Sequence, residues 1–372
     1  MEQFVIHVYG SHIYLFILVQ FNIKMSRAQE PNRPFLPFGN PFKMMLPKGS
    51  YLSPKLIELL NSFEKTLAQR FRNLKPQSKE DILTLGWMKC AMESLSAIHT
   101  DIKELITGLE LPVGDWDEKW VDVYLDNSVK LLDLCIAFSS EISRVNQGHL
   151  YLKCVVHHSE CASSNKFVRA CSSLDGWKQH ISSKNPRMQS CFTILENLIA
   201  TLDLPKIKNS SKGKVLMRAM YGVKVATVFV CKVFAAAFSG SAEKFLDLHV
   251  PETLLWAEAF NDLQAFVNGE IRSKYFSGKA TVLKELEAVD ASVKKLYPIV
   301  QEGGVDEEFK SSSLELGKSA EKLSEGLDSL AKEVDGFFQI VLTGRDALLC
   351  NLRVGTNVAD KSQVEKKNVA VK

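Results

Sequence analysis

Residues 213–240 read GKVLMRAMYGVKVATVFVCKVFAAAFSG, a mostly apolar stretch that nevertheless carries Lys214, Arg218, Lys224 and Lys232. The stretch is long enough to cross a bilayer, but each cation would cost about 2.5–3.5 kcal/mol near the bilayer centre. On a helical projection, Lys214, Arg218 and Lys232 fall on one side. Lys224 lies about 80° away from them, and the opposite side is apolar. We therefore predict an amphipathic helix covered by other helices of a bundle, with a helix lying in a membrane interface as the alternative.

The chain on both sides of this stretch repeats the helical period and contains few alternating β-branched runs. We predict an all-α fold, an elongated multi-helix bundle with long antiparallel, coiled-coil-like helices. The predicted helices span residues 54–73, 79–108, 116–157, 166–183, 187–202, 212–239, 252–276, 279–297 and 307–353.

A heptad pattern near the C-terminus supports the antiparallel arrangement. Apolar residues at alternating steps of three and four run from Ala320 to Val341, and the preceding helix has the same rhythm from Val282 to Leu296. A loop at residues 298–306 joins the two patterns, which predicts a hairpin that packs within one chain. We therefore expect a monomer.

The two ends of the chain differ from the helical domain predicted for residues 54–353. Residues 3–23 carry no Asp, Glu, Lys or Arg over about the length that spans a bilayer. A signal anchor there would leave the following cations, and the body of the protein, on the cytosolic side. Residues 1–24 form either such an anchor or an extension from a misplaced start, since Met25 could serve as the start. The polar tail, residues 354–372, is expected to be disordered.

A Pro- and Phe-rich arm is predicted for residues 25–53. Half of the chain's 12 prolines fall within residues 26–54, which excludes a helix there. The sequence FLPFGNPF places Phe35, Phe38 and Phe42 on a stiff backbone. We expect these rings to cover a groove of the protein's own core, with docking to a partner as the alternative. The arm and the basic side of residues 213–240 are our candidates for protein or lipid contact.

The composition excludes several classes of protein. Lys and Arg number 46 against 43 Asp and Glu, a net charge of +3, so no global field attracts nucleic acid. The 8 cysteines are sparse and unpatterned, which indicates reduced thiols in an intracellular protein.

No motif identifies a reaction. The sequence KGKV at residues 212–215 lacks both the spacing of a P-loop and a preceding strand, and no GxSxG elbow occurs. We predict that the protein is not an enzyme and has no catalytic residue and no cofactor.

One set of cysteines and histidines could supply zinc ligands. Cys154, His157 or His158, and Cys161 share one face of a predicted helix, with Cys171 not far along the chain. The sequence shows neither a fourth ligand nor an outer shell, and we predict no metal site.

Several long motifs carry a resemblance to a known family. They include FLPFGNPF (35–42), WMKCAMESL (87–95), LELPVGDWDEKWVDVYLDNSVKLLDLC (109–135), KGKVLMRAMYGVKV (212–225) and GRDALLCNLR (344–353). From about Met25 to Arg353 the chain resembles the BYPASS family of plant proteins.

The resemblance implies a helical protein without known catalytic residues. It implies a role in root and shoot development, where the family restrains production of a mobile root-derived signal linked to carotenoid metabolism. Protein partners and a plastid or membrane-associated location are implied as well, and a cytoplasmic location is the alternative.

Two other functions stay open. The bundle could be a carrier or enzyme for a hydrophobic metabolite, which a closed cavity lined by the helices of Trp87 and Trp116 would indicate. It could also be a peripheral membrane or secretion adaptor that uses the helix at residues 212–239.

Overall fold

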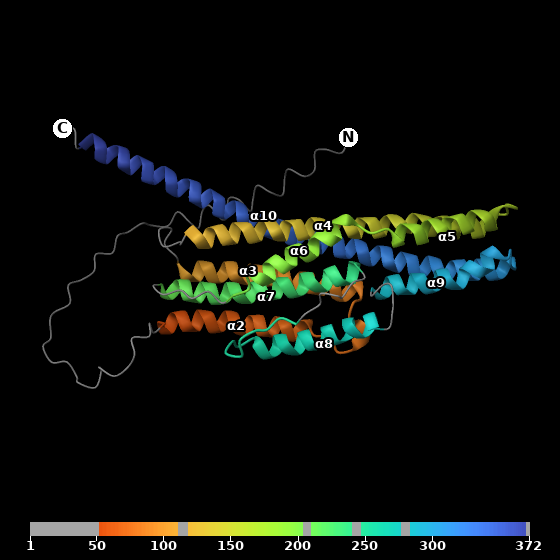
Figure 1. Cartoon of the computed structure of the whole chain (residues 1–372), viewed down its shortest axis with the longest axis horizontal. Coiled ribbons are helices and arrows are strands. Elements are labelled where there is room, and N and C mark those ends of the chain that lie inside the picture. The colour runs from red at the N-terminus through yellow and green to blue at the C-terminus, as the bar shows by residue number, and fades with distance from the viewer. Residues whose placement is uncertain (1–51, 111–117, 204–209, 240–246, 277–282, 370–372) are drawn as a thin grey trace. The chain divides into compact units, whose positions relative to one another are not determined.

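The structure, a computed structural model, describes residues 52–110, 118–203, 210–239, 247–276 and 283–369. These residues form helices joined by turns and loops, with no strand among them. They belong to one compact unit, Ser50–Lys372. The predicted all-α, multi-helix bundle is therefore confirmed (Figure 1).

Helix α2 (Pro54–Leu74) follows its prediction within one residue because both ends carry local signals. The Ser53 hydroxyl accepts a hydrogen bond from Leu56 N at 3.4 Å, and proline stands at the first helical position. The helix stops at Lys75, since the residue before a proline is disfavoured in the helical region.

Helix α3 (Leu85–Leu109) starts six residues later than the predicted residue 79. A short 3-10 turn, η2 (Lys79–Asp81), precedes it, and Leu83 then adopts a left-handed φ of 62°. The Thr84 hydroxyl caps the helix by accepting from Trp87 N at 3.1 Å. The backbone thus leaves the helical region at Leu83, and Thr84 sets the true start.

Helices α4 (Glu118–Glu160), α5 (Lys166–Ser182) and α6 (Pro186–Ala200) lie within three residues of their predicted ends. With 43 residues, α4 is about 65 Å long. Helix α5 turns back along α4, and α6 crosses the bundle from the end of α5 (Figure 1).

Helix α7 (Ser211–Ser239) contains nearly all of the apolar stretch at residues 213–240, and it packs against α2, α3 and α6. Among the described residues it is the one helix long and apolar enough to cross a membrane, yet 83% of its most apolar window is buried inside the bundle. A helix that is apolar on most sides is typical of a protein core. The apolar face is therefore covered by the protein's own helices, as predicted.

Helix α8 (Ala257–Phe276) starts five residues after the predicted residue 252. Pro251 opens a turn in which Leu254 N donates to Pro251 O at 3.2 Å, and a second turn brings Ala257 N to Leu254 O at 3.0 Å. In these turns the N–H groups of Leu254 and Ala257 bond to carbonyls three residues back, whereas an α-helix would bond them to carbonyls four residues back.

Helices α9 (Lys284–Gln301) and α10 (Asp306–Val369) form the predicted antiparallel hairpin. Lys295 Nζ lies 2.7 Å from Glu315 Oε2, and the Ser292 and Ser319 hydroxyls are 3.4 Å apart. The heptad residues of α10 from Ala320 to Val341 are buried.

Both helices of the hairpin end later than predicted. Helix α9 begins at Lys284 rather than residue 279, and it continues through Pro298 to Gln301 although the proline removes one backbone hydrogen bond near the helix end. Helix α10 extends past Arg353 to Val369 into the tail expected to be disordered. Gly355 alone does not end it, because one glycine in a helix costs only about 1 kcal/mol.

The longest helices, α4 and α10, pack side by side with opposite directions (Figure 1). Asn146 Nδ2 on α4 donates to Asp328 Oδ1 at 2.8 Å, and Ser139 Oγ reaches Asp335 Oδ1 at 3.4 Å. Buried Phe138 on α4 also meets Phe234 on α7, with ring centroids 5.3 Å apart. The core therefore continues from the α4–α10 pair into α7.

Candidate functional site

The contact candidates from the sequence divide into two groups. Phe35, Phe38 and Phe42 lie outside the described residues, as do the predicted arm and the extension at residues 1–24. The four cations of α7 lie within them.

Arg218 is engaged inside the bundle. Its Nη2 donates to Glu64 Oε2 and to Thr253 O, both at 3.1 Å, and its Nε also donates to the Glu64 carboxylate. Glu64 is fully buried on α2. Arg218 thus links α2, α7 and the turn before α8.

The other three cations of α7 are also partly or fully covered. Lys232 is buried, and Lys214 and Lys224 are half-buried. Lys224 Nζ donates to Thr201 O at 2.6 Å and to Thr201 Oγ1 at 2.8 Å. Burial lowers the pKa of Lys224 and of Lys232 to about 8. The side of α7 predicted to be a basic surface is therefore largely taken up by contacts within the chain.

The soft-ligand set on α4 brings two of its members together. Cys161 Sγ lies 3.7 Å from His157 Nε2 at the end of the helix. In the described part of the chain, no three His, Cys, Asp or Glu side chains converge as metal ligands would.

Two histidines, His99 and His180, are held by structural contacts. His99 Nε2 lies 3.1 Å from Thr227 Oγ1, whose own proton is donated to Val223 O at 2.7 Å. The His99 ring must therefore donate through Nε2. His180 Nε2 donates to Arg144 O at 2.7 Å. Thr227 Oγ1 gives its proton to a backbone carbonyl rather than to His99, and the partner of His180 is itself a backbone carbonyl, so neither histidine acts as a base in these contacts.

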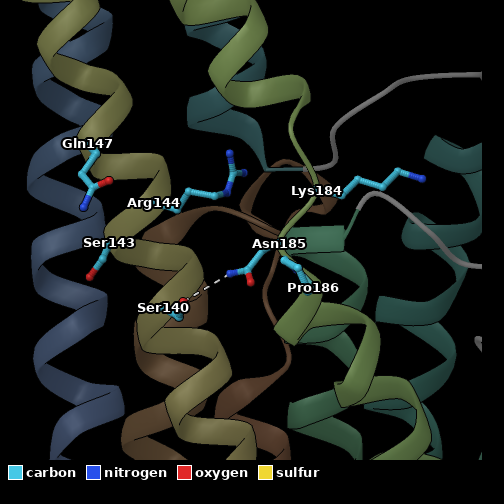
Figure 2. Close-up of a pocket in the computed structure, with 7 residues that line it drawn as sticks. All are labelled: Ser140, Ser143, Arg144, Gln147, Lys184, Asn185 and Pro186. Atoms are coloured by element: carbon cyan, nitrogen blue, oxygen red, sulfur yellow. Dashed lines mark hydrogen bonds between the residues drawn. The ribbon is translucent and has the colours of Figure 1, made fainter.

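A polar depression of about 350 Å³ lies where α4 passes the connection between α5 and α6 (Figure 2). Helix α4 contributes four of its lining residues, and the connection and the start of α6 contribute three. They are Ser140, Ser143, Arg144, Gln147, Lys184, Asn185 and Pro186.

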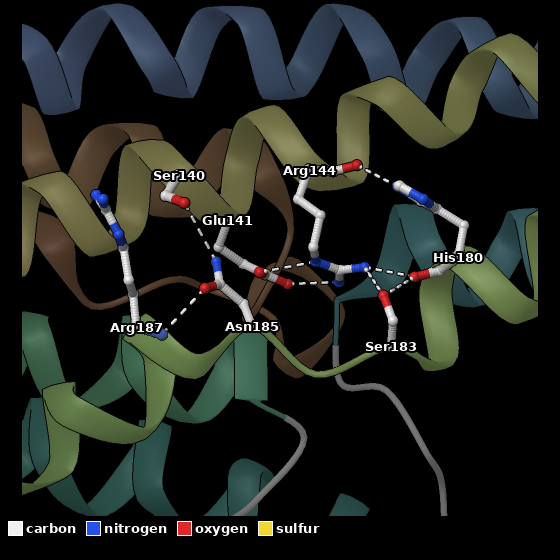
Figure 3. A network of polar contacts seen from close by, with 7 residues as sticks. All are labelled: Ser140, Glu141, Arg144, His180, Ser183, Asn185 and Arg187. Atoms are coloured by element: carbon white, nitrogen blue, oxygen red, sulfur yellow. Dashed lines mark hydrogen bonds and ion pairs between the residues drawn. The ribbon is translucent and has the colours of Figure 1, made fainter.

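An ion pair fixes the wall of this depression (Figure 3). The buried carboxylate of Glu141 accepts two hydrogen bonds from Arg144, from Nε at 2.9 Å and from Nη2 at 2.6 Å. The Arg144 Nη1 group donates to His180 O at 2.6 Å and lies 3.4 Å from Ser183 Oγ. The bidentate pair orients the guanidinium within α4, and its Nη1 hydrogen bond to His180 O links α4 to the end of α5.

Asn185 links the start of α6 to α4. Its Oδ1 accepts from Arg187 N at 3.0 Å, which caps the helix, and its Nδ2 lies 3.4 Å from Ser140 Oγ (Figure 3). The sequence carried a signal for this junction, since asparagine before proline is a typical helix start. The spacing of Glu141 and Arg144 also fits an ion pair on one helix face.

A second polar depression, of about 320 Å³, lies beside the extended segment before α8. There Gln264 satisfies the backbone of Leu248, accepting from its N at 2.8 Å and donating to its O at 3.0 Å. Asp247 accepts from Asn268 and from Arg272, and these two hydrogen bonds lower the pKa of its carboxyl although its burial acts in the opposite direction. The polar groups here serve to hold the segment on α8.

The fold and these sites define an all-α bundle held by buried ion pairs, with polar depressions on its surface. A family model described as "Protein ROH1-like" matches residues 50–175 and 163–350, and the chain belongs to this family. The resemblance to the BYPASS family is also confirmed.

Three relatives show the range of similarity. Protein BPS1, chloroplastic, from Arabidopsis thaliana is 57% identical over 88% of this chain and 93% of its own length. UPF0496 protein 4 from Oryza sativa subsp. indica is 39% identical over 91% of this chain and 100% of its own length. Protein ROH1D from Arabidopsis thaliana is 21% identical over 79% of this chain and 89% of its own length. No solved structure matches this one.

Proposed function

We propose that this protein is a non-enzymatic regulator of plant root and shoot development. It acts as a monomer through protein–protein contacts and restrains production of a mobile root-derived, carotenoid-linked signal. The observation that carries the proposal is the 57% identity with Protein BPS1 over 88% of the chain.

The described helices support a scaffold rather than a carrier of a hydrophobic metabolite. Trp87 is buried, and its Nε1 donates to Leu74 O at 3.0 Å, so the indole is anchored in the packing between α2 and α3. The two depressions reported above are open and polar, whereas a carrier needs an enclosed apolar cavity. Trp116 lies outside the described residues.

The packing of α7 argues against the alternative of a membrane adaptor that uses this helix. Since 83% of the most apolar window of α7 is buried, this helix would have to leave the bundle to reach a membrane. For membrane attachment we propose residues 3–23 instead, which would leave the body of the protein on the cytosolic side. A plastid is the alternative compartment, because the BPS1 relative is named chloroplastic.

Complementation tests the proposed function. Plants that lack the endogenous relative receive the full chain, the chain from Met25, or the full chain with Phe35, Phe38 and Phe42 changed to alanine. The full chain should restore shoot growth when expressed in the root alone. Failure to restore growth, with the protein accumulating normally, would refute the proposal.

The two variants locate the contacts. Loss of rescue in the Phe variant, with unchanged protein level, would assign partner binding to the arm. Loss of rescue by the chain from Met25 would assign a role to residues 1–24, and a fluorescent fusion of both chains would report the compartment.

A further inference from the structure

We infer that the outward side of α4 pairs with the same side of a second copy of this chain and so forms a reversible, parallel dimer. The surface consists of seven residues, which we call the outer face: Val129, Ile136, Ser140, Ser143, Gln147, Leu150 and Cys154. The inference goes beyond the proposed function, in which the monomer acts, because pairing would remove monomers as their concentration rises.

The outer face has the spacing of a coiled-coil seam. Its residues alternate steps of four and three from Ile136 to Cys154, and Val129 stands one heptad before Ile136. On α10 the same rhythm is buried inside the bundle, whereas on α4 Ile136 is 42% exposed and Leu150 is 65% exposed. These apolar side chains are therefore available to a second helix that carries the same spacing.

The outer face carries no charge. Between Asp133 and Lys153, the Asp, Glu, Lys and Arg residues of α4 are Glu141 and Arg144, which are paired with each other. Glu141 is buried, and Arg144 donates to the end of α5. A second copy could thus cover the outer face without burying an unpaired charge, which would be strongly unfavourable.

One border of the outer face is acidic. Helix α4 runs between α10 on one side and α5 with α6 on the other (Figure 3). On α10, Glu321, Asp328 and Asp335 recur at steps of seven and all contact α4. Asp328 lies opposite Asn146 at 2.8 Å, and Asp335 lies opposite Ser139 at 3.4 Å.

The other border is basic at the same level of α4. Lys184, in the connection between α5 and α6, lines the depression together with Ser140 and Gln147. Arg187 rises from α6 toward α4 near Ser140 (Figure 3). The acidic and basic borders therefore flank the same part of α4, residues 139–147.

The charges of the two borders are not neutralised within the chain. Asp328, Asp335, Lys184 and Arg187 are exposed, and in the described part of the chain they make no ion pair. Lys332 stands between the two aspartates in the sequence and reduces the negative charge of the acidic border without cancelling it.

These opposite borders select the arrangement of the dimer. A two-fold axis that runs along α4 makes the two α4 helices parallel and in register, so that Ile136 meets Ile136 and Leu150 meets Leu150. It also turns the acidic border of each copy toward the basic border of the other. An antiparallel pair would instead place the two acidic borders together. Because one helix face buries less area than a standard interface, the dimer should be reversible.

Sedimentation equilibrium of the full chain under reducing conditions tests the pairing. We expect a monomer–dimer equilibrium at micromolar concentrations. Ile136→Lys should raise the dissociation constant at least about tenfold, because two ammonium groups would be buried together. Ile57→Lys is the matched control, since Ile57 is 44% exposed on α2, which packs mainly against α3, α7 and α8. It should change the constant by less than about twofold.

A chain that stays monomeric would overturn the dimer. So would equal effects of the two substitutions, which would arise if residues 1–24 caused the association. Circular dichroism checks the fold of each variant, and Leu150→Lys repeats the test at a more exposed position of the outer face.

Charge reversal tests the arrangement. Lys184→Glu with Arg187→Glu reverses the basic border, and Asp328→Lys with Asp335→Lys reverses the acidic border. Each reversal alone should weaken dimerisation about tenfold, because like charges would then face each other at both borders. The two reversals together should restore the dissociation constant to within about threefold of the parent. No recovery in the combined variant would overturn the parallel pairing.

Cys154 reports the orientation directly. It is an exposed thiol on the outer face, so a short bis-maleimide should join the two copies through it, and Cys154→Ser should remove the crosslinked dimer. In an antiparallel pair centred on Ser143, the two Cys154 residues would lie about 33 Å apart, beyond the reach of the reagent. Crosslinking that Cys154→Ser leaves unchanged would overturn the arrangement.

The outcome is independent of the proposed function. A chain with Ile136→Lys that no longer dimerises should still restore shoot growth in the complementation test, because the monomer is the acting form. Failure of the parent chain to restore growth would refute the regulatory function and leave the dimer to be judged by sedimentation.

Discussion

The carboxylate of Glu64 is fully buried, and the guanidinium of Arg218 neutralises it from another helix. Leu255 N donates to the same carboxylate at 2.9 Å. A cation that the sequence presents as part of a surface stripe is therefore part of the core that joins α2, α7 and the turn before α8.

Changing Arg218 to methionine should lower the free energy of unfolding by about 3 kcal/mol. The variant leaves the Glu64 carboxylate buried without its cation, and the estimate is at the low end because Arg218 is 32% exposed. Urea unfolding followed by circular dichroism measures the change. Adding Glu64→Gln should recover part of the loss. A cost below about 1 kcal/mol, the value of an exposed ion pair, would contradict a buried one.

Two glycines of α10 should respond in opposite ways to alanine. A Cβ at Gly326 would lie 2.7 Å from Leu85 Cδ1 and 3.0 Å from Leu85 Cβ, whereas a Cβ at Gly336 meets nothing within 4 Å. Leu85 is buried and cannot move aside. Gly326→Ala should therefore destabilise the protein by about 1–3 kcal/mol.

Gly336→Ala is the matched control for that substitution. It should stabilise the protein by about 0.5–1 kcal/mol, because glycine is unfavourable inside a helix. Thermal unfolding of both variants gives the comparison. Equal shifts in the two would show that α10 does not approach α3 at Gly326 as described.

The stability of the fold should fall in mild acid. Burial lowers the pKa of His99 from 6.5 to about 4, and burial also lowers the pKa of His149. A histidine whose pKa is lower in the folded state binds fewer protons than in the unfolded state, so its contribution is fully present above pH 6.5. That contribution is lost as the pH falls toward 4.

His99→Gln provides the measurement. The slope of unfolding free energy against pH should become shallower between about pH 6.5 and 4 than in the parent. For His99 alone the difference should reach at most about 3 kcal/mol. An unchanged slope would mean that His99 is not neutral in the folded protein.

Asn185→Ala should cost about 1 kcal/mol, the value of a helix cap. It removes both the acceptor for Arg187 N and the contact with Ser140. Asn185→Ser keeps a capping oxygen and should restore most of the stability. If serine were no better than alanine, the cap would not be the main role of Asn185.

The sequence predicted the elements whose signals are local. Ser53 followed by Pro54 marked the start of α2, and the steps of three and four from Ala320 to Val341 marked the buried face of α10. The late start of α3 was missed because the Thr84 cap acts together with Glu285, 200 residues away, whose carboxylate accepts from Leu85 N at 3.1 Å. No local pattern contains that contact.

The candidate contact residues also divide into what one helix determines and what depends on contacts between distant elements. The helical projection grouped Lys214, Arg218 and Lys232 from the geometry of one helix alone. It could not show that Glu64 from α2 would reach Arg218, or that Lys232 would be buried. The depression was missed because it needs Arg144 and Lys184 from different elements, which only the turn from α5 into α6 brings together.

The pairing of α4 with α10 also governs when the protein can fold. Ser139 and Asp335, which meet across this pair, are 196 residues apart. At ordinary rates of synthesis, α4 leaves the ribosome about 10–40 s before its partner. During that time the face of α4 that carries Ser139 and Asn146 lacks α10, although α5 can already pack against α4. The nascent chain must therefore be kept from aggregating until the last helix emerges, and a truncation before α10 should yield insoluble protein rather than a smaller folded domain.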